Sequence, residues 1–146
     1  GFESPYSELT VFTPPNLKTE RLGLWDKDVV EAFIGADPTN RNHYTEFEVA
    51  PTGEKLDLVL DLPAKDFAWS SGFDAAVQVD RQRRVWTTEM RIPLAALSSK
   101  PPAPGDRWSL NLYRHDIVHG VFLAWNPTGT ASAHTPTKFG LLEFSR

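Results

Sequence analysis

The sequence predicts an all-β protein: an antiparallel, jelly-roll-like β-sandwich of about nine strands, forming one domain over residues 1–146. The first observation behind this prediction is a series of short segments in which apolar and polar residues alternate. The second is the spacing of turn residues, since 12 prolines and 9 glycines divide the chain at short intervals. The third is that only residues 94–97 could form a helical turn, whereas a parallel sheet would need crossover helices.

The predicted strands are short and are separated by prolines and polar turns. Residues 6–12 form the first, which ends at the prolines of residues 13–16 because proline lacks the N–H that a strand ladder needs. The others are predicted at residues 28–34, 43–49, 56–62, 75–79, 85–92, 108–114, 121–125 and 139–144. An arginine-rich turn at residues 81–84 joins two of them into a hairpin, and residues 126–138 form a long loop.

Alternation along these strands predicts which side chains share a sheet face. Glu31 lies on one face of its strand, and Tyr44, Glu46 and Glu48 share one face of the next. If these faces coincide, three carboxylates gather on one face together with Tyr44 and Asn111. Paired carboxylates at suitable separation could hydrolyse glycosides. A polar sheet face in contact with water explains the same pattern without any function.

The apolar side of the sandwich is predicted from the same alternation. The leucines of residues 56–62 point inward, which leaves Asp57 and Asp61 pointing outward. Trp86 and Trp108 lie on apolar strand faces, so we expect both in the core.

Composition excludes several classes of function. The net charge of −4 and the pI of about 5.5 contrast with the basic face of a nucleic-acid-binding protein. The absence of cysteine excludes disulfides, thiolate zinc sites and cysteine nucleophiles. No apolar run approaches the ~20 residues of a membrane span, and the chain opens without the basic and apolar stretches of a signal peptide.

Motifs of enzymes and nucleotide sites are missing, namely a Gly-x-Ser-x-Gly elbow, a phosphate loop and a dinucleotide fingerprint. His115 and His119 are spaced so that two metal ligands would share one face of a helix or a strand. No third ligand is evident, and Gly120 indicates a turn. We therefore expect two surface histidines at a hairpin rather than a metal site.

Trp25 has an unusually polar setting for an aromatic residue, because Asp26, Lys27 and Asp28 follow it. A flat indole face suits the C–H surface of a pyranose ring. Nearby carboxylate, amide and imidazole groups can bind sugar hydroxyls. On composition alone, packing in the interior explains Trp25 equally well.

Residues 24–34, which read Leu-Trp-Asp-Lys-Asp-Val-Val-Glu-Ala-Phe-Ile, resemble the family 9 carbohydrate-binding modules. Supporting segments follow in order at residues 44–49, 108–114, 123–127 and 136–140, so the resemblance extends over most of the chain. It implies a β-sandwich that binds sugars without catalysis and is usually attached to a secreted glycoside hydrolase. It also implies two tryptophans that clamp the terminal sugar and a glutamate that binds its hydroxyls.

Trp25 and Glu31 match the first tryptophan and the glutamate of this resemblance. The second tryptophan falls at Ala133, beside His134, whose ring could take its place. A sugar-binding arginine of the family falls at Glu48, which reverses the charge. The resemblance therefore supports the fold more strongly than the ligand chemistry.

The expected ligand is a saccharide, bound without catalysis by an exported bacterial protein, extracellular or periplasmic, that could be attached to a larger one. The expected ligand-binding residues are Trp25, Glu31, Tyr44, Glu48, Asn111, Asn126 and His134. No cofactor is required. The resemblance points to calcium, with Asp37, Asp57 and Asp61 as candidate ligands, but the spacing is not that of a calcium loop and we assign no metal. Family members have strands ahead of the segment that matches residues 1–3, so we also expect an exposed sheet edge.

Three other functions stay open. The chain could be a structural or interaction domain whose sugar site has decayed. It could be a haem-linked sandwich with Met90, the only methionine, as an axial ligand, although Met90 is expected in the core. It could be a glycosidase, although no carboxyl group of raised pKa can be identified from the sequence.

Overall fold

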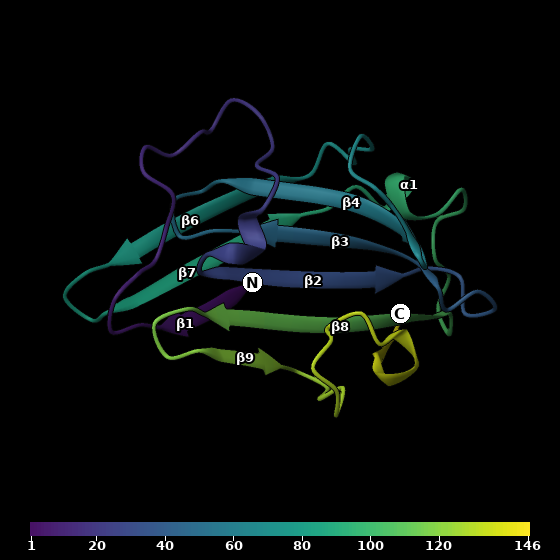
Figure 1. Cartoon of the computed structure of the whole chain (residues 1–146). Helices are drawn as coiled ribbons and strands as arrows, with labels where there is room; N and C mark the ends of the chain where they lie inside the picture. The colour runs from purple at the N-terminus through teal and green to yellow at the C-terminus, as the bar shows by residue number, and fades with distance from the viewer.

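The computed structural model describes all residues from Gly1 to Arg146 and consists of two antiparallel β-sheets packed as a sandwich (Figure 1). The strands are β1 (Phe2–Pro5), β2 (Val29–Gly35), β3 (His43–Val49), β4 (Lys55–Asp61), β5 (Ala64–Asp66), β6 (Asp74–Asp80), β7 (Val85–Arg91), β8 (Arg107–Asp116), β9 (Val121–Ala124) and β10 (Gly140–Glu143). The helical turns are η1 (Leu24–Asp26), α1 (Leu94–Leu97) and η2 (Pro136–Lys138). The predicted all-β antiparallel sandwich is confirmed. No helix is long and apolar enough to cross a membrane.

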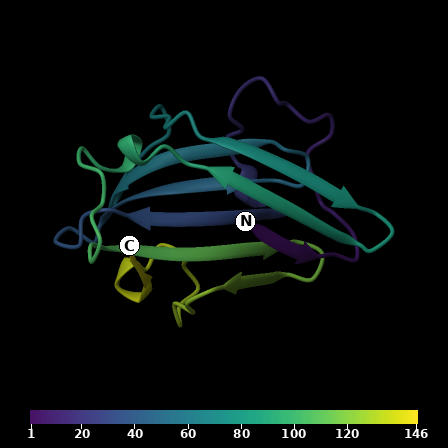
Figure 2. The same ribbon diagram turned by 180° about the vertical axis from the view of Figure 1, so that it is seen from behind.

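The two sheets differ in size. The small sheet has the order β1-β7-β6, and Figure 2 shows it in front of the large sheet. The large sheet has the order β10-β8-β2-β3-β4-β5, and β9 also pairs with β8. Its inner face packs on the small sheet. Its outer face, which Figure 1 shows from the front, is covered in part by the segment that contains η1 and by residues 125–139.

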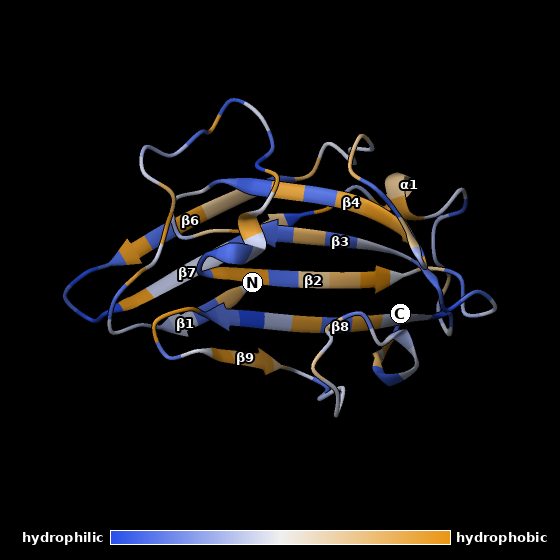
Figure 3. Ribbon diagram, viewed as in Figure 1, coloured by the Kyte–Doolittle hydropathy of each residue, from blue (hydrophilic) through white to orange (hydrophobic).

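Both faces of the large sheet carry apolar clusters, and hydrophilic residues interrupt the apolar runs of its central strands (Figure 3). Between the sheets, the buried side chains include Val30, Phe47 and Trp86. On the outer face they include Phe33 and Leu58. A strand that is buried on both faces has no fully solvated side, which explains how carboxylates on β2 and β3 come to be buried.

The core predictions have mixed outcomes. Trp86 and Trp108 are buried, as predicted, with 1% and 5% of their surface exposed. Met90 is partly buried and packs between the sheets, also as predicted. Asp57 was predicted to point into solvent, and this is wrong. Asp57 is paired with Phe47 and lies on the face between the sheets, whereas the leucines predicted to point inward are buried on the outer face. The buried carboxylate of Asp57 accepts hydrogen bonds from the main-chain N–H (2.8 Å) and the hydroxyl of Ser71.

The strand predicted over residues 6–12 is also wrong. Its backbone is held instead by Asp28, whose carboxylate accepts the N–H of Thr10 at 2.5 Å and whose own N–H donates to the Thr10 carbonyl at 2.9 Å. These bonds occupy both main-chain groups of Thr10, which in a strand would bind a neighbouring strand. The first strand lies earlier, at β1, and the short β5 was not predicted, so the structure has ten strands rather than about nine.

Two short strands, β9 and β10, lie end to end along one edge of the large sheet and are separated in the sequence by a long loop. β9 pairs with residues 113–116 of β8, and β10 pairs with residues 107–110 on the same edge. Residues 125–139 leave the edge between them and fold over the outer face. Where the chain returns, a Cβ on Gly140 would lie 2.5 Å from the Trp125 ring, so only glycine fits beneath that indole.

Candidate functional site

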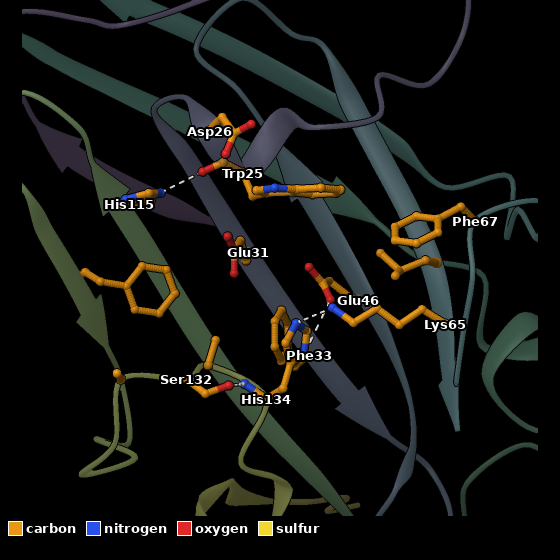
Figure 4. A pocket seen from close by; sticks show the side chains of 14 residues that line it. Trp25, Asp26, Glu31, Phe33, Glu46, Lys65, Phe67, His115, Ser132 and His134 are labelled. Carbon is orange, nitrogen blue, oxygen red and sulfur yellow. Dashed lines mark hydrogen bonds and ion pairs between the residues drawn. The ribbon is translucent and has the colours of Figure 1, made fainter. Parts of the chain in front are cut away.

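A pocket of about 490 Å³ opens on the outer face of the large sheet (Figure 4). Glu31 and Phe33 of β2 and Glu46 of β3 form its floor together with a leucine of β4. Its rim comes from segments far apart in the sequence, and the rim residues are Trp25, Asp26, Lys65, Phe67, His115, Phe122 and residues 131–134. The tertiary fold, rather than any local motif, therefore assembles this pocket.

Trp25 forms part of the rim and is neither sealed in the interior nor free in solvent. It lies in η1, which begins after Gly23, a residue with φ of 81° that favours glycine. Its carbonyl oxygen is 2.8 Å from Nδ1 of His115, and its ring centroid is 5.9 Å from that of Phe67. The half-buried indole packs against the outer-face cluster and still lines the pocket.

Glu31, Glu46 and Glu48 form a buried group that we call the carboxyl cluster. They are 3%, 4% and 0% exposed, and strand pairing places Glu31 directly opposite Glu48. Glu46 Oε2 and both Glu48 carboxylate oxygens are buried without a hydrogen-bond partner. Unpartnered buried carboxylates are costly, so such a group is typical of a functional site.

The carboxyl cluster shifts the ionisation of its own members. Burial, and then the charge of Glu46, raises the pKa of Glu31 to about 8. Burial raises the pKa of Glu46 to about 6, while Glu48 and the charge of Lys65 act in the opposite direction. Burial, with Glu31 and Glu46 adding repulsion, raises the pKa of Glu48 well above its ordinary value. These carboxyl groups therefore hold protons at a pH where exposed ones would have lost them.

His134 lies beside the carboxyl cluster in a defined tautomer. Its Nε2 is 2.7 Å from the Lys65 ammonium, which can only donate, so Nε2 accepts. The proton therefore lies on Nδ1, which is 2.8 Å from the Tyr44 hydroxyl oxygen and 3.9 Å from Glu46 Oε2. Burial and the charge of Lys65 lower the pKa of His134 to about 4, and its ring stacks on Phe33.

The loop that carries His134 is held in place by two buried side chains of β8. The Asn111 amide donates to the Asn126 carbonyl at 2.8 Å and accepts the Asn126 N–H at 2.9 Å. The Tyr113 hydroxyl accepts from Asn111 and donates to the Ala133 carbonyl, each at 2.8 Å. Asn111 and Tyr113 thus position the pocket rim from beneath.

The structure brings some of the expected ligand-binding residues together and separates others. Trp25, Glu31 and His134 line the pocket. The remaining four, which are Tyr44, Glu48, Asn111 and Asn126, do not line it. Tyr44 positions His134 from beneath, and Glu48 lies under the floor because it is fully buried opposite Glu31. Asn111 holds the main chain of Asn126, and the exposed side chain of Asn126 binds the Lys138 carbonyl, outside the pocket.

Sequence reasoning did not include Glu46 of the floor among the expected ligand-binding residues, and it missed rim residues that include Lys65, Phe67, His115 and Phe122. Lys65 lies on β5 and Phe67 directly after it, and β5 was too short for its alternation to be recognised. His115 and Phe122 face one another across the β8–β9 hairpin, with ring centroids 5.4 Å apart. The alternation of side chains along the two strands of that hairpin could have predicted that His115 and Phe122 share a face. It could not have predicted the pocket that these two residues border.

Metal-ligating groups do not converge in this structure. No group of three or more His, Cys, Asp or Glu side chains could hold a metal ion. Of the aspartates considered for calcium, Asp37 caps the exposed Thr39, and the buried Asp57 binds Ser71. His115 contacts the Trp25 carbonyl and His119 contacts Asp116, which fits two hairpin histidines with separate local partners.

Comparisons with known proteins agree with the fold. The chain superposes on a crystal structure described as a carbohydrate-binding protein from Bacteroides uniformis, with a TM-score of 0.70 and 21% identity over 86% of this chain and 65% of that one. It also superposes on a family 9 carbohydrate-binding module from Caldicellulosiruptor kristjanssonii in complex with glucose, with a TM-score of 0.63 and 17% identity over 90% of this chain and 66% of that one. The predicted fold of the family 9 carbohydrate-binding modules is therefore confirmed.

Sequence comparisons are sparser. No protein-family model matches the chain. It is 26% identical over 139 residues to an extracellular protein of the fungus Arthroderma benhamiae. The match covers 83% of this chain but only 62% of that protein, so the chain spans less than two thirds of the fungal relative.

Proposed function

We propose that this protein binds saccharides without catalysis, through the pocket on the outer face of the large sheet. The observation that carries the proposal is the convergence of a half-buried indole, Trp25, and two buried carboxyl groups, Glu31 and Glu46, in one open pocket. An aromatic plate beside hydrogen-bonding groups is the combination that a sugar ring requires, because its C–H face is apolar and its edge is polar.

Each pocket residue has a role in this proposal. The Trp25 indole stacks on the C–H face of a pyranose, and Phe67, next to it, extends the apolar surface. Glu31 and Glu46 bind hydroxyls from the floor, and His134, fixed by Tyr44 and Lys65, borders the sugar edge. With one stacking face, the dissociation constant should be on the order of 0.1–1 mM, or about −4 to −5.5 kcal/mol.

The comparisons support a sugar as the ligand. One structural neighbour is described as carbohydrate-binding, and the other was solved in complex with glucose. The fungal relative is an extracellular protein, which supports a location outside the cell. We accordingly propose an exported protein, and its bacterial origin and attachment to a larger protein remain predictions.

Calorimetric titration of glucose and cello-oligosaccharides against the wild type and Trp25→Ala tests the proposal. We expect binding to fall at least about tenfold in the variant. Trp125→Ala is the matched control, because Trp125 is 55% exposed and does not line the pocket. Thermal unfolding of both variants checks that they remain folded. Equal binding by wild type and Trp25→Ala would remove Trp25 from the site, and no binding at all would favour a decayed site.

Glycoside hydrolysis is a second candidate, and one observation favours it. Glu31 and Glu46 line the same pocket with pKa values of about 8 and about 6, and two carboxyl groups whose pKa values are pushed apart are typical of glycosidases. Turnover of an activated aryl glycoside that disappears in Glu31→Gln would establish catalysis. We expect no turnover.

A further inference from the structure

The carboxyl cluster of Glu31, Glu46 and Glu48 could ionise fully only if more positive charge lay beside it. Lys65 is the lysine that interacts with it electrostatically, and its exposed ammonium already donates to His134. His134 contributes no compensating charge at neutral pH, because Nε2 accepts that bond and the imidazole is neutral. Three buried carboxyl groups therefore share one partly engaged cation.

The groups around the cluster do not change this balance. The titratable and charged side chains that face it are Asp26 of η1, Tyr44 of β3, Lys65 of β5, Tyr113 and His115 of β8, and His134 of the loop. Burial raises the pKa of Tyr113 to about 12, so its hydroxyl stays neutral. Asp26 is a further acidic residue at the rim.

The oxygens of the cluster accept no hydrogen bond from a group outside the cluster. Glu46 lines the pocket, is 4% exposed, and leaves its Oε2 without a hydrogen bond. No hydrogen bond contributes to the ionisation of Glu31, which also lines the pocket. Buried carboxylates normally have hydrogen-bonded or ionic partners, because desolvation otherwise disfavours them. A positively charged ligand group would supply what the protein lacks.

The walls of the pocket suit the same ligand group. Trp25, Phe67 and Phe122 line it around the two glutamates, as Figure 4 shows for the labelled Trp25 and Phe67. The face of an aromatic ring is negative and attracts a cation that comes within about 6 Å of it. Aromatic walls above a carboxylate floor thus favour an ammonium group over a hydroxyl.

We infer that the pocket prefers an amino sugar, whose ammonium group pairs with Glu31 and Glu46 while its ring stacks on Trp25. This inference rests on the proposed saccharide binding and names the class of saccharide. A neutral sugar could still bind through its hydroxyls. Charge-assisted hydrogen bonds are about twice as strong as neutral ones, so we expect at least about tenfold tighter binding of the amino sugar.

Proton balance provides a second signature. At pH 7 the raised pKa of Glu31 leaves it largely protonated in the empty pocket. Pairing with an ammonium then ionises the carboxyl group and releases its proton to the buffer, while the ligand nitrogen keeps its own. Amino-sugar binding should therefore strengthen as the pH rises from 5.5 to 7, and binding of a neutral sugar should not release that proton.

The test is calorimetric titration of the wild-type protein at pH 7 with D-glucosamine, D-glucose and N-acetyl-D-glucosamine. N-acetyl-D-glucosamine keeps the nitrogen but removes its charge. Each titration is run in two buffers of different ionisation enthalpy, so that proton release appears as a difference in heat. We expect glucosamine to bind about tenfold more tightly than the other two and to be the only one that releases a proton.

Two variants assign the preference to the cluster. In Glu31→Gln the ratio of glucosamine to glucose affinity should fall about tenfold. Glu8→Gln makes the same substitution at an exposed position that does not line the pocket, and should leave the ratio unchanged. Equal affinities for glucosamine and glucose in the wild type would overturn the amino-sugar inference while saccharide binding stands. No binding of any of the three would overturn both.

Discussion

The side-chain amide of Asn111 binds the main chain of Asn126 as a neighbouring strand would. Its Oδ1 accepts the Asn126 N–H at 2.9 Å, and its Nδ2 donates to the Asn126 carbonyl at 2.8 Å. One residue earlier, the N–H of Trp125 donates to the Leu112 carbonyl at 2.8 Å, just beyond the last pair of the ladder that β9 forms with β8. Asn111 therefore marks the point where the edge strand leaves the sheet and begins to cover the pocket.

Replacing Asn111 should destabilise the fold and weaken ligand binding without any contact to ligand. Asn111→Leu leaves the Asn126 N–H and carbonyl without their buried partner, at a cost of about 2–4 kcal/mol. Urea denaturation measures this loss. Asn126→Ala is the control, since its main chain still binds Asn111, and it should cost no more than about 1 kcal/mol. Similar losses in both variants would contradict the role of Asn111.

Glu31 should make the protein less stable as the pH rises. Its pKa is raised in the folded state from 4.5 to about 8, so the folded state binds more protons than the unfolded state between these values. The free energy of unfolding therefore falls as the pH increases through this window. Below pH 4.5 both states are protonated and the effect disappears.

Glu31→Gln removes this penalty. We expect the variant to be about 1–3 kcal/mol more stable than the wild type at pH 8, and nearly equal to it at pH 4. Chemical denaturation at a series of pH values measures the difference. A variant less stable than the wild type at pH 8 would show that the ionised carboxylate has a partner that stabilises it.

His134 should stay neutral far below the usual range of histidine. Its pKa is lowered from 6.5 to about 4, so the unfolded state binds more protons between these values and stability falls as the pH drops through them. Heteronuclear NMR of the imidazole nitrogens should report a midpoint near pH 4 and the proton on Nδ1 at pH 7. Lys65→Met should raise the midpoint, because it removes the neighbouring charge. A wild-type midpoint near 6.5 would disprove the contact between Lys65 and His134.

Alternation along β2 and β3 made the carboxyl cluster predictable. Glu31, Glu46 and Glu48 were expected on one face, and the pairing of Glu31 with Glu48 confirms it. Their burial was not predictable from the strands themselves. It arises because η1 and residues 125–139, which lie far away in the sequence, cover that face.

The choice among the expected ligand residues also depended on the tertiary structure. Asn111 and Asn126 were expected to bind ligand, but the side chain of Asn111 binds the main chain of Asn126 instead. Lys65 lies on β5 and Phe67 follows it, and β5 is too short for an alternation of polar and apolar residues to be recognised. Both residues reach the pocket because β5 pairs with β4.

The sequence by itself determined the sandwich, the identity of the buried tryptophans of the core and the face on which the carboxyl groups lie. It could do so because the side-chain period of a strand is local and survives in any all-β arrangement. The tertiary structure alone decided which of those groups reach a pocket, how far their pKa values shift and which loop residues stand opposite them. Those properties depend on burial and on contacts between distant segments, and neither is encoded in the spacing of neighbouring residues.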